Sequence, residues 1–249
     1  MSLTSEIIQT VNNSNVINEP FPHMNINEFF ENEFYMKLLK SLPKKEEYVQ
    51  INKTGSAPDK YPDERFVFDL NKESLNNLDK FKQDTLMEII KGFTSFDFFR
   101  ATTLKFNDVI QERVQNFSKK EIDLFGKNNF KFNIRISLVK DFSKYLLGSH
   151  TDSISKVLTF LFYIPEDKSL EHCGTSLYKP RDIPTFTHEL QYNINDTKKY
   201  FTEEKRIPFI PNSVLIFPRT NFSYHGVSSL NIGSKARNLL LLNYYFKNI

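Results

Sequence analysis

The second half of this sequence is a succession of short strand patterns. Apolar, β-branched and aromatic residues recur there in short runs that Pro, Gly and Asn interrupt. Runs of this kind that follow one another without helical spacing between them are typical of an antiparallel sandwich or jelly roll. The runs that we predict as strands cover residues 131–139, 145–152, 156–164, 173–178, 185–192, 208–217, 223–229 and 236–247.

The first half has helical spacing instead. Apolar residues four apart from Phe30 to Leu42 predict a helix that Pro43 ends, and broken apolar stripes predict helical regions over about 73–96 and 106–125. Residues 44–68 are charged and interrupted by Gly and Pro, which predicts a long loop or an irregular hairpin. We therefore expect one domain over residues 1–249: a partly ordered segment (1–19), a helical support region (20–130) and a jelly-roll core (131–249).

Composition narrows the class of protein. The 249 residues include 25 Phe and 11 Tyr, which is enough apolar mass for one large core. A balance of 33 basic and 30 acidic residues, +3, argues against a nucleic-acid partner. The single cysteine, Cys173, excludes an intrachain disulfide and fits a reducing compartment. Neither a signal peptide nor a membrane-spanning run is recognisable, so we expect a cytoplasmic protein without a membrane partner.

A histidine and an aspartate two residues apart stand directly before one of the most apolar strands. On an extended chain, His150 and Asp152 would point to the same face. A second histidine, His225, follows a later apolar strand, and partner strands of a jelly roll meet at one end of the barrel. Two histidines and one carboxylate form the facial triad that holds Fe(II) with open positions. Taken alone, His150 and Asp152 could be a surface pair at a strand end, and His225 a packed histidine near a turn.

Arg237 opens the last apolar strand, twelve residues after His225. Burying a guanidinium at the start of such a strand costs free energy unless an anion pairs with it. Its planar fork suits a carboxylate, which it can bind through two parallel hydrogen bonds. The alternative is a salt bridge to one of the many acidic residues of the chain.

The order of these four residues resembles the Fe(II)- and 2-oxoglutarate-dependent dioxygenases. Within that superfamily, the amino-acid sequence is similar to a bacterial and phage branch related to prolyl-4-hydroxylase-like oxygenases. The likeness covers roughly residues 20–247, although it is vague between 44 and 130. The segments that carry it are Ser149-His-Thr-Asp152, Lys156-Val-Leu-Thr-Phe-Leu-Phe-Tyr-Ile-Pro165, Gly174-Thr-Ser-Leu-Tyr-Lys-Pro180, Phe217-Pro218, His225-Gly-Val227 and Arg237-Asn-Leu-Leu-Leu.

The resemblance implies a double-stranded β-helix buttressed by helices. It implies that His150, Asp152 and His225 ligate Fe(II) and that Arg237 binds the distal carboxylate of 2-oxoglutarate. The implied reaction uses O2, releases succinate and CO2, and hydroxylates an aliphatic carbon. Because Asp152 is a carboxylate rather than Ala or Gly, no coordination position is freed for chloride, which favours hydroxylation over halogenation.

Three further residues are weaker candidates for binding 2-oxoglutarate. Tyr145 and Thr159 carry hydroxyl groups that could donate to it, although Tyr145 has the wrong strand parity relative to His150 unless a bulge intervenes. Lys156 interrupts the entry to an apolar strand and could pair with a carboxylate, either of the substrate or of the protein. For Tyr145 and Thr159 the alternative is a role in the core or at the rim.

Two functions from different classes remain open. The first is a dioxygenase that acts on a polar small molecule or a peptidyl side chain, because residues 44–68 and 165–207 are rich in Lys, Asp and Glu. The second is a non-catalytic metal-binding jelly roll of the cupin kind, serving as a binding or sensor protein. Arg237 separates the two, since a binding module has no use for a cation that binds 2-oxoglutarate.

Overall fold

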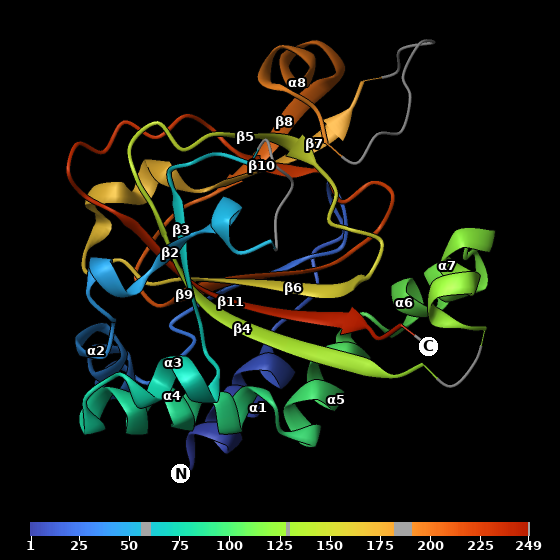
Figure 1. Ribbon diagram of the computed structural model, residues 1–249. Helices are drawn as coiled ribbons and strands as arrows, with labels where there is room; N and C mark the ends of the chain where they lie inside the picture. The colour runs from blue at the N-terminus through green and yellow to red at the C-terminus, as the bar shows by residue number, and fades with distance from the viewer. Residues whose placement is uncertain (56–60, 128–129, 182–190, 249) are drawn as a thin grey trace.

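The computed structural model of the protein describes residues 1–55, 61–127, 130–181 and 191–248, and Figure 1 shows its arrangement. Its helices are α1 (Leu3–Asn13), α2 (Asn32–Lys40), α3 (Lys72–Asn76), α4 (Lys80–Phe93), α5 (Phe96–Lys105), α6 (Asn107–Gln115), α7 (Lys119–Phe125) and α8 (Ile194–Tyr200). Its strands are β1 (Met24–Asn27), β2 (Val49–Gln50), β3 (Arg65–Asp69), β4 (Phe132–Asp141), β5 (Leu147–His150), β6 (Lys156–Tyr163), β7 (Thr175–Pro180), β8 (Phe201–Ile207), β9 (Ser213–Pro218), β10 (His225–Val227) and β11 (Arg237–Phe246).

Seven strands form a large antiparallel sheet in the order β1-β9-β6-β11-β4-β3-β2. Strand β11 lies at its centre and pairs with β4 on one side and β6 on the other. The central strands consist of β-branched, leucine and aromatic residues that are buried on both faces of the sheet. Runs of this kind are expected where a sheet has a packed layer on each side.

Four strands form a smaller sheet in the order β5-β10-β7-β8, which lies across from the large sheet (Figure 1). One apolar cluster joins the two, because Leu147, Leu177 and Val227 of the small sheet pack with Val139 and Leu239 of the large one. Two antiparallel sheets packed face to face around one core are a jelly roll, and this part of the expected fold is confirmed.

Helices α1 to α5 cover the outer face of the large sheet, on the side away from the small sheet (Figure 1). Each of α1, α4 and α5 begins at a polar cap, since Ser2, Asp79 and Ser95 accept a hydrogen bond from a backbone N–H of the first turn. The buried faces of these helices and the outer face of the sheet share one large aromatic and aliphatic cluster. The helical support region therefore covers one face of the large sheet, and the other face packs against the small sheet.

Several local expectations differ from the structure. Residues 3–13 form a helix whose buried Leu3, Ile7 and Val11 recur every four residues, where we expected a partly ordered segment. Of the two alternatives predicted for residues 44–68, a long loop or an irregular hairpin, the structure has the hairpin, formed by β2 and β3, which extends the large sheet. Strand β8 and helices α5 and α8 were not expected. The strand expected over 185–192 falls mostly outside the described residues.

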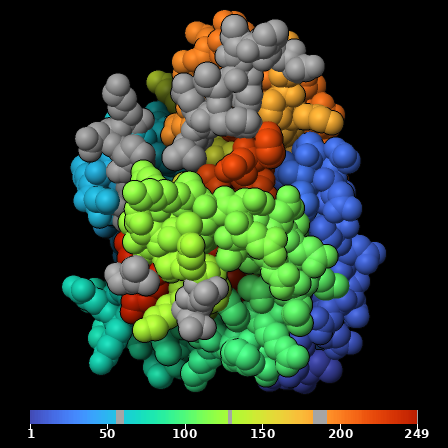
Figure 2. All heavy atoms as spheres, turned by 90° about the vertical axis from the view of Figure 1, so that its right-hand side faces the viewer, coloured from blue at the N-terminus to red at the C-terminus, as the bar shows by residue number. Residues whose placement is uncertain are grey.

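On the face seen in Figure 2, helices α6 and α7 (green) lie beside the orange-red segment that leads into β10. Here α7 begins with a capping box, in which Ser118 and Glu121 exchange side-chain and backbone hydrogen bonds. Across the described ranges of the chain, none of the helices combines the length and apolar character that crossing a bilayer requires.

Candidate metal centre

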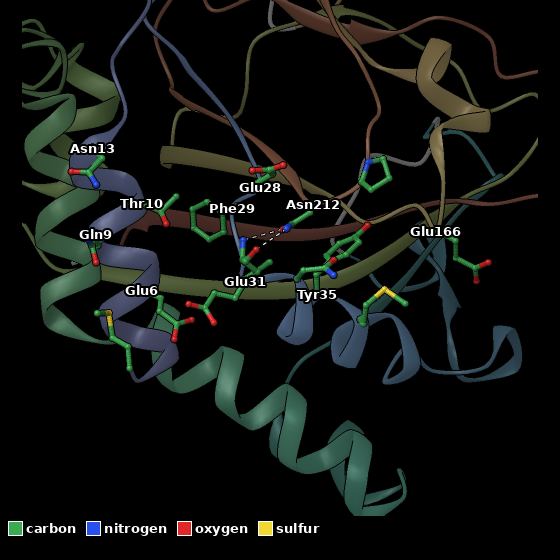
Figure 3. A pocket seen from close by; sticks show the side chains of 15 residues that line it. Glu6, Gln9, Thr10, Asn13, Glu28, Phe29, Glu31, Tyr35, Glu166 and Asn212 are labelled. Carbon is green, nitrogen blue, oxygen red and sulfur yellow. Dashed lines mark hydrogen bonds between the residues drawn. The ribbon is translucent and has the colours of Figure 1, made fainter.

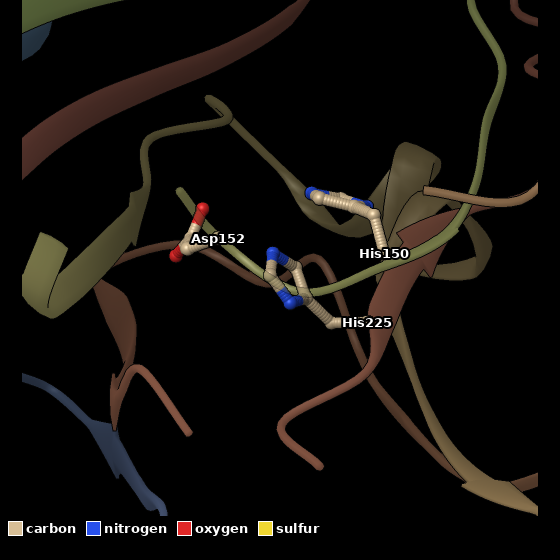
Figure 4. Close-up of side chains that lie close together, drawn as sticks. All are labelled: His150, Asp152 and His225. Carbon is tan, nitrogen blue, oxygen red and sulfur yellow. The ribbon is translucent and has the colours of Figure 1, made fainter. Parts of the chain in front are cut away.

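Strands β5 and β10 bring the two predicted histidines together. The strands are antiparallel neighbours with His225 directly opposite His150, and the imidazole centroids lie 4.1 Å apart. Asp152 follows β5 by two residues, and its carboxylate points to the same space as the two rings (Figure 4). One ligand atom from each of the three residues lies within 4.8 Å of the others. Among the described residues, this is the one group of His, Cys, Asp and Glu side chains that could hold a metal ion.

Two glycines permit this close approach. A Cβ atom at Gly148 would lie 2.1 Å from the Tyr192 carbonyl oxygen, and one at Gly226 would lie 2.6 Å from the Leu147 carbonyl oxygen. Both positions are in the strands that carry the histidines, two residues before His150 and one after His225. A side chain at Gly226 would push β10 away from β5 and so separate the histidines, whereas a side chain at Gly148 would push β5 away from the backbone of Tyr192.

Backbone carbonyl groups set the orientation of both imidazole rings. Nδ1 of His150 lies 3.1 Å from the Gly148 oxygen, and Nδ1 of His225 lies 3.0 Å from the Ser223 oxygen. A ring that donates its Nδ1–H to a carbonyl has the tautomer in which Nε2 carries the free lone pair. Both rings therefore offer Nε2 as the ligand atom.

The Asp152 carboxylate is held by one contact on each oxygen. Lys156 Nζ donates to Oδ1 at 2.7 Å, and Thr159 Oγ1 donates to Oδ2 at 2.5 Å. The guanidinium of Arg219 donates to the backbone oxygen of Asp152 at 3.3 Å. These contacts fix the carboxylate although it lies beyond the end of β5, and each oxygen retains a lone pair for a metal.

Burial and neighbouring charges favour the ligand forms of the triad. Burial, with the adjacent His225, lowers the pKa of His150 to about 3, and burial also lowers the pKa of His225. Burial alone would raise the pKa of Asp152, but Lys156 and the two histidines bring it well below its usual value. At neutral pH the site therefore consists of two neutral imidazoles and a carboxylate, which is the form that binds a divalent cation.

An inner cavity of about 90 Å³ extends from the triad into the barrel. The triad lies in its wall together with Arg237, and apolar side chains of both sheets line the space beside them: Leu147, Leu161, Val227, Leu239 and Leu241. Arg237 is 1% exposed although it is charged. The cavity thus has a metal-binding group, an apolar wall and a buried cation.

The Arg237 guanidinium has the salt bridge to an acidic residue that was the alternative prediction for it, and it lies in a buried polar cluster. It forms a salt bridge of 2.8 Å with Asp141 and donates to the Cys173 oxygen and to Thr175 Oγ1. Among the described residues, these contacts use three of the five N–H groups of the guanidinium. Arg65 binds the same Asp141 carboxylate through two hydrogen bonds, of 2.6 and 2.8 Å.

The three weaker candidates for binding 2-oxoglutarate do not all lie in the wall of the inner cavity. Thr159 and Lys156 line the inner cavity and both contact Asp152, so Lys156 pairs with a protein carboxylate. Tyr145 is fully buried outside the cavity lining, where its hydroxyl lies 3.2 Å from that of Tyr61 and its ring packs under Arg65. Whether any of them contacts 2-oxoglutarate stays a prediction.

Asp141, Arg65 and Asn243 are site residues that the sequence analysis missed. Asp141 lies opposite Arg237 on one neighbouring strand and opposite Arg65 on the other, and this register depends on contacts between distant segments. A local signal did exist for Asn243: it lies six residues after Arg237 on the same strand, so both face the cavity.

A larger cavity of about 780 Å³ lies outside the barrel, between α1 and the start of α2 (Figure 3). Glutamates and amides line much of it, among them Glu6, Glu28, Glu31 and Asn212. Its carboxylates do not converge into a group that could hold a metal, within the part of the chain that the structure describes. The smaller inner cavity, which contains the triad, is therefore the candidate site.

Comparison with solved structures supports the fold. A prolyl 4-hydroxylase from Phytophthora capsici superposes with a TM-score of 0.50 at 12% sequence identity, over 98% of this chain and 64% of that one, so this chain spans less than two thirds of its length. A Pseudomonas putida prolyl-4-hydroxylase (TM-score 0.49, 8% identity, 98% and 99% of the two chains) and the epimerase SnoN, solved with Fe3+, alpha-ketoglutarate and nogalamycin RO (0.49, 9%, 98% and 83%), are also similar. No protein-family model matches the chain, and no curated protein matches it in sequence. At 12% identity, the likeness to the Phytophthora capsici structure shows the fold alone, and the assignment of the site depends on the geometry of the residues described above.

Proposed function

We propose that the protein is an Fe(II)- and 2-oxoglutarate-dependent dioxygenase that hydroxylates an aliphatic carbon and releases succinate and CO2. The observation that carries this proposal is that one buried cavity is lined by both the His150–Asp152–His225 triad and the Arg237 guanidinium. A site for a metal alone needs the triad. A buried cation in the same cavity wall is what a cosubstrate with a second carboxylate needs.

The triad fits Fe(II) by the chemistry of its donors. His150 and His225 would each bind through Nε2 and Asp152 through one carboxylate oxygen, which leaves positions for a bidentate cosubstrate and O2. When bound, Fe(II) and 2-oxoglutarate would supply the electrons that reduce O2, and the reduced oxygen would have the oxidising power to attack an unactivated C–H bond. The protein's part is to hold the ligands through Gly148, Ser223, Lys156 and Thr159, and to surround the reacting atoms with apolar side chains.

Arg237 would bind the distal carboxylate of 2-oxoglutarate. Its side chain is fixed by Asp141 and by the Cys173 oxygen, and it packs near the rings of Tyr163 and Phe209. The apolar side chains Leu161, Leu239 and Leu241 line the same cavity and suit the methylene carbons of the cosubstrate. A guanidinium whose orientation is already set loses little conformational freedom when an anion binds.

The test is an anaerobic titration of the metal-free protein with Fe(II) and then 2-oxoglutarate, followed by the visible charge-transfer band of the chelate. We expect the band in the wild type. We expect no band in Asp152→Ala, and Arg237→Ala should require far more 2-oxoglutarate to develop it. Arg206→Ala is the matched control. Arg206 pairs with Glu203 on strand β8, and it is not a lining residue of any cavity that contains a residue of the triad. Its titration should match the wild type.

One observation favours the second candidate, a metal-binding jelly roll without catalysis. Arg237 already has a carboxylate partner in Asp141, so the structure also gives it a purely structural role. The titration separates the two functions. A wild-type protein that binds Fe(II) but gives no band at saturating 2-oxoglutarate is not a 2-oxoglutarate oxygenase, and the binding or sensor protein is then the better description.

A further inference from the structure

A further cavity of about 300 Å³, distinct from the two described above, opens beside the metal centre. Three cationic side chains line it. Arg65, Arg135 and Lys156 come from three strands of the large sheet, and Asp152 is the one carboxylate in the described lining. This outer cavity shares His150 and Asp152 with the inner one, so a molecule bound in it has access to the metal ligands. Its volume lies at the lower end of the range for small-molecule sites.

Among the described residues, the charges around the two cavities do not cancel. Arg65 and Arg237 share Asp141, Arg135 pairs with Asp69, and Lys156 pairs with Asp152. The described lining residues and their ion-pair partners therefore contain four cations and three carboxylates. Fe(II) and the 2-oxoglutarate dianion have equal and opposite charges, so binding both leaves this excess of one positive charge unchanged.

The excess charge can be assigned to Lys156 if the proposed function is correct. Asp152 and the near carboxylate of 2-oxoglutarate then neutralise the metal, and the distal carboxylate neutralises Arg237. Asp141 remains with Arg65, and Asp69 remains with Arg135. Lys156, which lines both cavities with a side chain that is 20% exposed, is left without a full counter-charge. An uncompensated charge in such a place favours an anionic ligand.

The backbone holds this lysine in place. Its N–H donates to the Ser153 oxygen, and its carbonyl accepts from the guanidinium of Arg113. These hydrogen bonds hold the backbone of the segment from Asp152 to Lys156 in place. The ammonium group therefore has a defined position beside the metal ligand.

A second, independent feature is an unmet hydrogen bond. Asn243 lines both cavities and is 5% exposed, and its Oδ1 is buried without a hydrogen-bond partner among the described residues. It lies opposite Thr159 on one neighbouring strand and opposite Arg135 on the other. A buried amide that lacks a partner in the protein favours a ligand that supplies one.

We propose that the substrate is a small molecule that carries one oxyanion group, a carboxylate or a phosphate, and that Lys156 binds this group in the outer cavity while Asn243 hydrogen-bonds a polar group next to it. The inference rests on the proposed function and names the substrate class of the same site. It places the anion beside Asp152, so that the remainder of the molecule is near the metal.

The experiment uses the anaerobic Fe(II)–2-oxoglutarate complex of the full chain, and its readout is the change in the charge-transfer band on adding a probe. The probes are a set of free amino acids and hydroxy acids, the amides of the same compounds, which lack the carboxylate, and a set of small phosphate monoesters. We expect members of the carboxylate or the phosphate set to shift the band, and the set that does so identifies the oxyanion. The matched amides should not shift it.

Variants of Lys156 then test the assignment. Loss of a charged hydrogen bond predicts that Lys156→Met weakens the binding of the active probe by roughly tenfold or more, and that Lys156→Arg recovers part of the loss. Asn243→Leu should also weaken it. Lys179→Met, an exposed lysine on β7, is the control and should bind the probe as the wild type does. The affinity for 2-oxoglutarate is measured in each variant, so that damage to the metal site is recognised.

Failure of this inference differs from failure of the proposed function. Absence of the band in the wild type refutes the oxygenase itself. A normal band that no oxyanion probe shifts, or that the amides shift equally, overturns the anionic substrate class and leaves the oxygenase in place. Equal loss of probe and 2-oxoglutarate affinity in Lys156→Met overturns the role of Lys156 in substrate binding.

Discussion

The two faces of the large sheet use the same strands for different purposes. On β11, Leu240, Leu242 and Tyr244 point to the helices, are fully buried and belong to the larger apolar cluster. The alternate residues Arg237 and Asn243 point into the barrel and line its cavity. The strand period of two therefore places the apolar packing against the helices on one side of the strand and the cavity residues on the other.

Apart from the cavity between α1 and α2, the two faces differ in how completely the space against the central strands is filled. Helices α1 to α5 close the outer face with aromatic side chains, among which the rings of Phe93 and Phe162 stack with centroids 4.9 Å apart. The small sheet closes the inner face less completely, so two cavities remain, and charged side chains there are held by carboxylates from neighbouring strands. Outer-face substitutions should change stability, and inner-face substitutions should also change binding.

The largest loss of stability is expected from removing the buried carboxylate on the inner face. Asp141→Ala leaves Arg65 and Arg237 buried without their counter-charge, and we expect the free energy of unfolding to fall by about 3–5 kcal/mol. Asp69→Ala is the matched control: its partner Arg135 has a half-exposed side chain, and the expected loss is about 1 kcal/mol or less. Denaturant unfolding measures both. Equal losses in the two variants would contradict the assignment.

Two neighbouring leucines on opposite faces of β11 allow the effects of outer-face and inner-face substitutions to be compared directly. Leu240→Ala opens a cavity in the helix-covered core and should lower the free energy of unfolding by about 2–5 kcal/mol, with unchanged affinity for 2-oxoglutarate. Leu241→Ala enlarges a cavity that already exists, so it should destabilise less and weaken 2-oxoglutarate binding. Unfolding and titration are measured on the same preparations. A reversed pattern would mean that the inner cavity does not bind the cosubstrate.

A smaller effect is expected from the threonine that orients the metal ligand. Thr159→Val keeps the shape of the side chain but removes the hydrogen bond to Asp152, and loss of such a contact lowers metal affinity by roughly 10–100-fold. Competition with a chromogenic chelator measures the affinity. Thr175→Val, at the Arg237 end of the cavity, is the control and should bind metal as tightly as the wild type.

The smallest effect concerns acid stability near the edge strand β1. Burial lowers the pKa of His23, so the folded protein binds its proton less readily than the unfolded chain does. Stability should therefore fall as the pH decreases below about 6.5, the ordinary pKa of histidine. His23→Gln should reduce this decline when the free energies of unfolding at pH 5.5 and pH 8 are compared. An unchanged pH dependence would show that His23 is protonated equally in both states.

The sequence was most informative where a local period decides the structure. Strands β4, β6 and β11 were predicted within a few residues because their apolar runs are long and uninterrupted. The convergence of His150 and Asp152 also followed from the spacing of two residues, and the order of the strands brought His225 to them.

The features that were missed depend on tertiary contacts or on weak local patterns. Strand β8 has polar residues over most of its length, and it is a strand because it pairs with β7. The partnership of Arg237 with Asp141 depends on the register of β4 and β11, which no local pattern determines. Helix α1 did have a signal, in Leu3, Ile7 and Val11, but the polar and Asn-rich composition of the segment obscured it.

Gly148 and Gly226 have a consequence for how this protein can diverge. Neither residue offers a ligand or a charge, yet each occupies a place where a methyl group would overlap a backbone oxygen. Descendants of this chain could acquire new substrates by replacing residues of the outer cavity one at a time. They could not replace Gly226 without moving β10 away from β5, or Gly148 without moving β5 away from Tyr192, so these two positions should vary less than many of the residues that contact the substrate.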